Sequence, residues 1–236
     1  MKNKITLLLV CIFLSLTSTA QVLINEEPVT INVQEGTLSG TLRVPSNSKT
    51  IPVVLFIAGS GPTDRDGNSP MMKNNSYKLF AEHLFSNNIA SLCFDKRLIA
   101  ASKVSQKEDD IRFEDYVEDV KRWVELLSKD KRFSRIIIAG HSEGSLIGML
   151  ASKNNPKVAK YISIAGIGTS AAEALKDQLN IQLKGQPQSV KDMIFSYIDS
   201  LKQGNTISNI PPSLYSLFRP SVQPYMISWF KYVPQE

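Results

Sequence analysis

The chain has 236 residues, of which 42% are hydrophobic and 21% are charged. These proportions are typical of a globular domain and exclude a disordered, collagen-like or repeat protein. With two Cys, two His and no C-x-x-C pair, the sequence excludes a disulfide-stapled scaffold and predicts no metal site and no cofactor. The net charge of +5 comes from Lys and Arg scattered among acidic residues, which disfavours nucleic-acid binding because that function requires a clustered basic surface.

The first 20 residues have the pattern of a secretory signal peptide. Lys2 and Lys4 form a basic start, Ile5–Leu16 is apolar, and Ser18-Thr19-Ala20 supplies small residues before the expected cleavage site. The apolar stretch is shorter than the roughly 20 residues that cross a bilayer, which disfavours a transmembrane anchor. The sequence therefore predicts an exported protein, periplasmic or secreted, with no stable membrane span once residues 1–20 are removed.

Residues 21–168 alternate strand and helix patterns. A period-2 pattern over 22–45 predicts two antiparallel strands. Continuous apolar runs predict buried parallel strands at 51–57, 89–94, 135–139 and 161–165. Helical spacing of apolar residues predicts helices at 77–85, 112–128 and 146–153. This order indicates an α/β fold with a doubly wound, mostly parallel sheet and N-terminal antiparallel strands.

Beyond residue 168 the pattern changes from α/β to helical. Residues 171–183 and 189–203 have helical periodicity, and 211–235 is rich in aromatic residues and interrupted by five prolines. No further strand-type run occurs there. We expect residues 169–236 to form a helical cap over the carboxyl edge of the sheet, incomplete in this chain.

One short motif points to chemistry. Gly140-His141-Ser142-Glu143-Gly144 fits G-x-S-x-G and lies between a predicted strand and a predicted helix, as a nucleophile elbow requires. Such a turn holds the Ser hydroxyl in the open, and glycines on both sides allow the chain to pass close to its neighbours. The sequence thus predicts Ser142 as nucleophile, Gly140 and Gly144 as elbow glycines, and the backbone N–H of Glu143 as an oxyanion donor.

The second oxyanion donor is expected in the loop after the strand at 51–57. Gly59-Ser60-Gly61-Pro62 lies there, and its glycines would let the backbone approach a substrate closely. We favour the Ser60 amide as the donor and Gly61 as the alternative. A phosphate-binding role is disfavoured because neither G-x-x-x-x-G-K-[ST] nor G-x-G-x-x-G occurs.

Four motifs in order carry a resemblance to a known family. AGSGPTDRDGN at 58–68, FDKR at 94–97, FEDY at 113–116 and GHSEG at 140–144 resemble the motifs of exported bacterial α/β-hydrolases of the serine aminopeptidase-like (S33-like) esterase group. The resemblance covers residues 25–168. It implies a Ser-His-Asp esterase with a helical cap and Ser142 as nucleophile.

The same resemblance assigns the loop after the strand at 51–57 to the border of the substrate pocket. Gly59 and Gly61 belong to this pocket loop, together with Asp64, Arg65 and Asp66. For the three charged residues a second interpretation stays open, in which they form a structural ion pair that ties the loop down.

The family pattern breaks at the general base. A Ser nucleophile of this fold is followed by an Asp or Glu and then a His, but no His follows Ser142. His141 adjoins the nucleophile, where its side chain is expected to point away from Oγ, and His83 lies mid-helix and is expected to be partly buried. We therefore expect a C-terminally truncated hydrolase or, alternatively, a natural pseudo-enzyme. The strand at 161–165 would be an open apolar edge, so we expect the isolated chain to aggregate.

The expected function is hydrolysis of carboxylic esters through an acyl-enzyme on Ser142, with the triad Asp and His absent from this chain and the chain alone inactive. A small-molecule ester is the expected partner. The alternatives are an inactive module that binds an apolar ligand with its aromatic cap residues, and a peptidase or thioesterase of the same fold.

Overall fold

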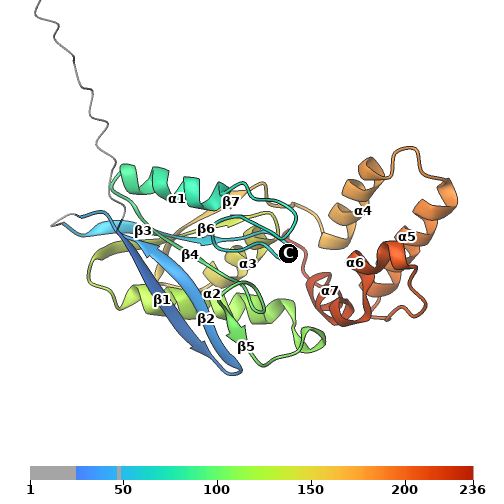
Figure 1. Ribbon diagram of the computed structural model, residues 1–236, viewed down its shortest axis with the longest axis horizontal. Helices are drawn as coiled ribbons and strands as arrows, with labels where there is room; N and C mark the ends of the chain where they lie inside the picture. The colour runs from blue at the N-terminus through green and yellow to red at the C-terminus, as the bar shows by residue number, and fades with distance from the viewer. Residues whose placement is uncertain (1–24, 47–48, 236) are drawn as a thin grey trace, which may run out of the picture.

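The computed structural model describes residues 25–46 and 49–235, so the predicted signal peptide lies outside the described residues. Its strands form one mixed sheet in the order β1-β2-β4-β3-β6-β7, with β5 beside β2 (Figure 1). The strands are β1 (Glu26–Val33), β2 (Gly36–Arg43), β3 (Ile51–Ile57), β4 (Ala90–Phe94), β5 (Lys103–Val104), β6 (Phe133–His141) and β7 (Val158–Ile164).

The sheet has an antiparallel part and a parallel part. The strand β2 pairs antiparallel with β1, β4 and β5, whereas the pairs β3–β4, β3–β6 and β6–β7 are parallel. The continuous apolar runs lie in the parallel part, where β3 and β4 are covered on both faces. This arrangement confirms the predicted fold class.

Three helices cover the two faces of the sheet. These helices are α1 (Ser76–Ser86), α2 (Phe113–Ser128) and α3 (Glu143–Ser152). Figure 1 shows α1 on one side of the sheet and α2 on the other. Leu55, Leu92 and Ile138 share the main core with α2 and α3, whereas Phe56 and Cys93 pack with α1. Burial raises the pKa of the Cys93 thiol to about 12, so this buried cysteine acts as a packing residue.

The strand β7 differs from its prediction as a buried strand. All seven of its residues are exposed or half-buried, and Ile162 is 45% exposed. The reason is its position, since β7 ends the strand order and, in the described part of the chain, pairs with β6 alone. Before residue 169, two described elements were not predicted, namely β5 and a 3-10 turn at Glu108–Asp110.

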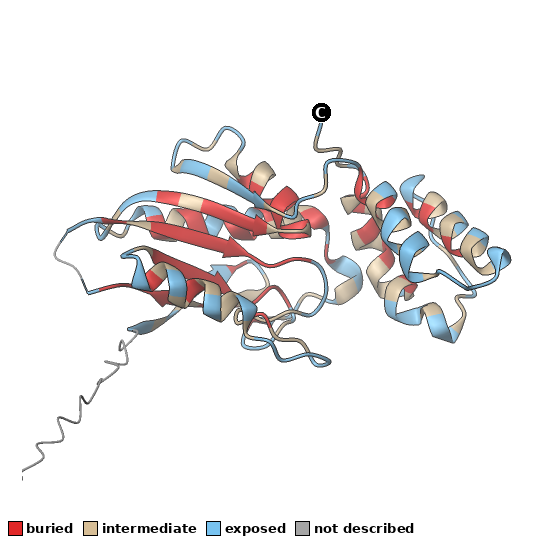
Figure 2. Ribbon diagram, turned by 90° about the horizontal axis from the view of Figure 1, so that it is seen from above, coloured by how far each residue is buried: buried red, intermediate tan, exposed pale blue. Residues whose placement is uncertain are grey.

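The remaining helices form the cap, which we define as residues 169–235. It contains α4 (Ala171–Gln182), α5 (Gln188–Lys202), α6 (Tyr215–Phe218) and α7 (Gln223–Trp229), with 3-10 turns at Pro212–Leu214 and Pro220–Val222. The cap has its own apolar core, in which Ile194, Ile198, Leu201, Phe218 and Met226 are buried. Figure 2 shows buried residues along the sheet and exposed outer sides on the cap helices. No helix in the described ranges is long and apolar enough to cross a bilayer.

Candidate active site

The predicted nucleophile, Ser142, lies on the turn between β6 and α3. Its backbone has φ 52° and ψ −119°, a conformation that is strained for a residue with a Cβ. The Ser142 N–H donates a 2.9 Å hydrogen bond to the carbonyl of Ile164 at the end of β7, which fastens the turn to the neighbouring strand. The surrounding structure therefore holds a strained Ser at the carboxyl edge of the sheet, as the elbow motif predicts.

The two predicted elbow glycines are required by close backbone contacts. A Cβ on Gly140 would lie 2.1 Å from the carbonyl oxygen of Gly144. A Cβ on Gly144 would lie 2.4 Å from the carbonyl oxygen of Ile57. Both distances are shorter than any tolerated contact, so α3 can start against β3 only because these positions lack a side chain.

The loop after β3 lies against this turn. A Cβ placed on Gly59 would be 3.2 Å from the Cβ of Ser142, so the predicted pocket loop touches the nucleophile. Ser60 and Ser142 line the same two cavities. Among the described residues, neither the Ser60 nor the Glu143 amide has a hydrogen-bond acceptor. The structure thus brings both predicted oxyanion donors to the nucleophile and leaves them free to bind a substrate oxygen.

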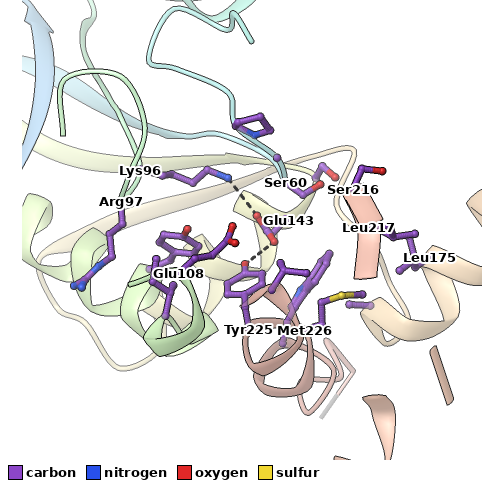
Figure 3. Close-up of a pocket in the computed structure, with 18 of the residues that line it drawn as sticks. Ser60, Lys96, Arg97, Glu108, Glu143, Leu175, Ser216, Leu217, Tyr225 and Met226 are labelled. Carbon is purple, nitrogen blue, oxygen red and sulfur yellow. Dashed lines mark hydrogen bonds and ion pairs between the residues drawn. The ribbon is translucent and has the colours of Figure 1, made fainter. Parts of the chain in front are cut away.

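Three buried or half-buried polar side chains meet beside these amides. The Glu143 carboxylate lies 3.5 Å from the Lys96 ammonium and accepts a 2.5 Å hydrogen bond from the Tyr225 hydroxyl (Figure 3). Lys96 also donates a 2.7 Å hydrogen bond to the carbonyl oxygen of Gly59. Burial, and next the nearby Glu143 charge, raise the pKa of Tyr225 well above its ordinary value, so this hydroxyl is a donor at neutral pH.

Sequence reasoning assigned no role to Lys96 or Tyr225. The FDKR motif at 94–97 includes Lys96, and this motif was the feature of the sequence that could have indicated a role for Lys96. The motif does not reveal that the Lys96 ammonium reaches a carbonyl in another loop. Tyr225 lies in the proline-interrupted stretch, whose aromatic residues were predicted to pack in the cap or to bind an apolar ligand, not to donate a hydrogen bond to Glu143.

The charged part of the predicted pocket loop has structural contacts. Arg65 binds the buried Asp95 carboxylate at 2.5 Å, Asp66 pairs with Arg43 at 3.3 Å, and the Asp64 carboxylate accepts the amides of Asp66 and Asn68. Asp64, Arg65 and Asp66 line neither of the two cavities at Ser142, whereas Gly61 lines the first and Gly59 the second. The contacts of the three charged residues are those of the structural ion-pair alternative.

Ser142 lies between two cavities of different character. The first has a volume of about 610 Å³ and lies between the sheet edge and the cap. Its cap side is mostly apolar and includes Ala171, Leu175, Leu217, Val222 and Met226. The second has a volume of about 480 Å³ and lies between α1 and the loop before it. A molecule bound across Ser142 could therefore place one part in each cavity.

A charged contact closes the rim of the first cavity. The Glu108 carboxylate binds the guanidinium of Arg219, with Nε to Oε2 at 2.9 Å, and accepts a 2.5 Å hydrogen bond from Ser221. The hydrogen bonds from Arg219, and next the one from Ser221, lower the pKa of Glu108 below its ordinary value. Because Arg219 and Ser221 belong to the cap, this contact joins the cap to the sheet side of the site.

Neither histidine is placed as a general base. The His141 side chain lines the second cavity, and its Nδ1 lies 3.4 Å from the Tyr77 hydroxyl. His83 lies on the exposed face of α1, not partly buried as the helical pattern predicts, because the buried positions of α1 are Ala81 and Phe85. Within the described ranges, the Ser142 hydroxyl has no hydrogen-bonded base.

Comparisons with known proteins agree with this geometry. The family model "Serine aminopeptidase, S33" matches residues 72–202. The chain is 28% identical over 197 residues to esterase EstD of Thermotoga maritima, a match that covers 83% of this chain and 44% of EstD. This chain therefore spans less than half the length of that curated relative.

Solved structures share the fold. The α/β-hydrolase GrgF of Penicillium sp. sh18 superposes with a TM-score of 0.58 at 19% identity, covering 89% of this chain and 74% of GrgF. The esterase Pf2001 of Pyrococcus furiosus superposes with a TM-score of 0.53 at 15% identity, covering 74% of this chain and 64% of Pf2001. At these identities the likeness concerns the fold alone.

Proposed function

Because the chain belongs to the serine aminopeptidase (S33) family of α/β-hydrolases, we propose that it is a serine esterase that cleaves carboxylic esters through an acyl-enzyme on Ser142. The observation that carries the proposal is the strained Ser142 beside two amides that have no acceptor in the described part of the chain. Matching of EstD, an esterase, over 83% of this chain supports an ester substrate.

The proposed reaction follows from the positions of these groups. The Ser142 hydroxyl oxygen attacks the ester carbonyl carbon, its proton passes to a general base, and the carbonyl oxygen becomes an oxyanion held by the Ser60 and Glu143 amides. The C–O bond to the alcohol then breaks as the base returns the proton to the leaving oxygen. Water attacks the resulting acyl-Ser142 in the same way and releases the acid.

The general base is the part of the triad that this sequence lacks. No His follows Ser142, although the chain order of this fold places the acid and the His after the nucleophile. We therefore propose that this chain does not itself supply the Asp and the His of the triad, and that the 236-residue chain alone hydrolyses esters poorly. We expect the purified 236-residue chain to hydrolyse p-nitrophenyl butyrate no faster than its Ser142→Ala variant, and clear Ser142-dependent hydrolysis by this chain would contradict the proposal.

The first cavity favours an ester over a peptide with a free amino terminus. Its cap side is apolar and its volume of about 610 Å³ suits an acyl chain. An aminopeptidase needs a free carboxylate for the substrate ammonium, but the two carboxylates of this cavity are engaged. Glu108 binds Arg219, and Glu143 is bound by Lys96 and Tyr225.

The test uses the full-length protein encoded by the gene. We expect it to hydrolyse p-nitrophenyl butyrate and to be labelled by a fluorophosphonate probe at Ser142, because only an activated nucleophile reacts with this probe. Ser142→Ala should abolish both signals. The matched control is Ser128→Ala, at an exposed hydroxyl that binds only the Glu125 carbonyl, and it should retain both.

A full-length protein that neither labels nor hydrolyses the ester would overturn the esterase proposal. That result, together with binding of an apolar fluorophore to the first cavity, would favour the alternative of a non-catalytic module for an apolar ligand.

We also propose that the protein is exported to the periplasm or secreted after cleavage behind Ala20. The support is the basic start, the apolar stretch and the small residues within 1–20. Mass spectrometry of the mature protein should find Gln21 as its first residue. A mature protein that retains Met1 would contradict this proposal.

A further inference from the structure

Lys96 is a buried cation that touches both sides of the proposed oxyanion hole. It is 4% exposed, and its ammonium donates to the Gly59 carbonyl at 2.7 Å and lies 3.5 Å from the Glu143 carboxylate. We propose that Lys96 is a positioning residue that orients the Ser60 amide toward the oxyanion. This inference rests on the proposed esterase function and adds a role for a side chain that does not touch the reacting atoms.

The geometry of the peptide bond connects Lys96 to Ser60. The Gly59 carbonyl and the Ser60 N–H belong to one planar trans peptide unit, in which they point in opposite directions. An ammonium fixed on the Gly59 oxygen therefore fixes the direction of the Ser60 N–H. The same hydrogen bond polarises the peptide unit and strengthens the amide as a donor.

The chain around Ser60 needs such an external anchor. Gly59 and Gly61 flank Ser60, and Gly61 has φ 87° with open space around its Cα. Glycine adopts several backbone conformations at similar energy, so the local sequence alone does not hold the Gly59–Ser60 peptide in one orientation. The hydrogen bond from Lys96 supplies this restraint from the loop that follows β4.

Lys96 is itself fixed by the residue that provides the other amide. Its ammonium lies beside the Glu143 carboxylate, which is 2% exposed, and 5.5 Å from the centre of the Tyr116 ring. Burying an ammonium is costly unless it is paired and hydrogen-bonded. The Lys96–Glu143 pair meets this requirement, and it joins the Gly59–Ser60 peptide to the residue whose N–H is the other proposed donor (Figure 3).

The test compares two variants of the full-length protein. Glu143→Gln keeps the Lys96 bond to Gly59, whereas the double variant Lys96→Met with Glu143→Gln removes that bond without leaving a lone buried charge. We expect the double variant to have a kcat about ten- to a hundredfold below that of Glu143→Gln, with KM changed by less than about threefold, because the oxyanion contact forms only in the transition state.

A control and a folding measurement accompany this comparison. Lys121→Met removes an exposed Lys that pairs with Glu118 on the surface of α2, and it should leave kcat and KM at wild-type values. The melting temperature of each variant is measured first, so that a loss of activity in a folded protein is distinguished from unfolding. Equal kcat values for the folded Glu143→Gln and double variants would overturn the proposal, and so would a loss confined to KM.

A second readout does not depend on activity. In protein labelled with 13C at the glycine carbonyl and 15N at serine, Gly59–Ser60 and Gly144–Ser145 are the Gly-Ser peptide bonds of this sequence. We expect the Gly59–Ser60 signal to move between Glu143→Gln and the double variant, with Gly144–Ser145 as internal reference. An unchanged Gly59–Ser60 signal would overturn the proposal. A wild type that hydrolyses no ester and does not react with the fluorophosphonate probe would instead overturn the esterase function. The Gly59–Ser60 signal would still decide the role of Lys96.

Discussion

The two sides of the first cavity are built in different ways. On the sheet side, close backbone contacts at Gly140 and Gly144 fix the elbow, and buried ion pairs such as Arg97–Asp119 at 2.8 Å fix the loops around it. On the cap side, the wall consists of apolar side chains on short helices. The sheet side therefore carries the nucleophile and the backbone amides, whose positions must be exact. The cap side carries apolar side chains that only shape the cavity.

The cap is joined to the sheet side by a few polar contacts. Ser228 accepts the N–H of Phe113 at 2.8 Å, the Tyr232 hydroxyl donates to Glu114 at 2.9 Å, and Tyr225 binds Glu143. Because the two sides are built separately, substitutions in the cap can change the substrate preference while the chemistry of the sheet side is preserved. Four predictions test this contrast, in order of decreasing effect.

The largest loss of stability is expected where the backbone contacts of the sheet side are shortest. Gly140→Ala places a Cβ 2.1 Å from the Gly144 carbonyl oxygen, so β6 and α3 must separate. We expect the free energy of unfolding in urea to fall by about 3 kcal/mol or more. The control is Gly168→Ala, where no atom lies within 4 Å of the added Cβ. Equal stability of the two variants would show that the elbow is not rigidly packed.

The second-largest effect is expected for the hydrogen bond from Tyr225 on the cap to Glu143 on the sheet side. Tyr225→Phe removes the donor to the buried Glu143 carboxylate, and we expect a loss of about 2 kcal/mol in the free energy of unfolding, because hydrogen bonds to buried charges are the stronger ones. Tyr215→Phe is the control, since Tyr215 is a half-exposed tyrosine of the same cap. An unchanged Tyr225→Phe stability would contradict a structural link through Glu143.

A change in the cap wall should alter selectivity and preserve the chemistry. Leu175→Trp narrows the first cavity, so we expect the ratio of kcat/KM for p-nitrophenyl hexanoate over acetate to fall about tenfold, equivalent to about 1.4 kcal/mol. Activity on acetate should change little. Ile181→Trp, at a position of the same helix that is 73% exposed, should leave the ratio unchanged. A parallel loss on both esters would argue against the first cavity as the acyl site.

The smallest effect is expected for the Glu108–Arg219 ion pair at the rim of the first cavity. The lowered pKa of Glu108 means that the Glu108–Arg219 pair contributes stability above the ordinary Glu pKa of about 4.3, and that this contribution is lost as the pH falls through the lower folded-state pKa. Both partners are about one-third exposed, so solvent screens the pair and we expect about 0.5 kcal/mol.

The measurement for this pair is the difference in free energy of unfolding between the wild type and Glu108→Gln. The difference should be present at pH 7 and should disappear as the pH falls through the lowered folded-state pKa of Glu108 and the wild-type carboxyl becomes protonated. A difference that grows toward low pH would contradict the sign of this prediction.

The sequence allowed the fold to be predicted where the information is local. Apolar runs over 51–57 and 135–139 indicate strands because burial on both faces leaves no polar positions, and GHSEG indicates the elbow because only glycines fit its contacts. The exposure of β7 was not predictable, because an apolar run does not say where its strand lies in the order of the sheet.

The sequence predicted which residues form the candidate site, but it did not predict which side chains from other parts of the chain hold these residues in place. Ser60, Ser142 and Glu143 were predicted as site residues because their motifs follow strands. Lys96 reaches a carbonyl 37 residues earlier in the chain, and Arg219 reaches a carboxylate 111 residues away. Such pairings depend on how loops and cap helices fold back on the sheet, and residue spacing carries no information about them.

The buried thiol of Cys93 gives the central strand β4 an internal reporter of unfolding. The thiolate is the reactive form of cysteine, and a side chain that is 1% exposed with a pKa of about 12 presents almost none of it to an alkylating reagent. Modification of Cys93 therefore requires α1 to leave the sheet or the sheet itself to open, whereas opening of the cap leaves the thiol covered. Alkylation rates compared with amide exchange in α5 would thus separate cap opening from global unfolding in one protein.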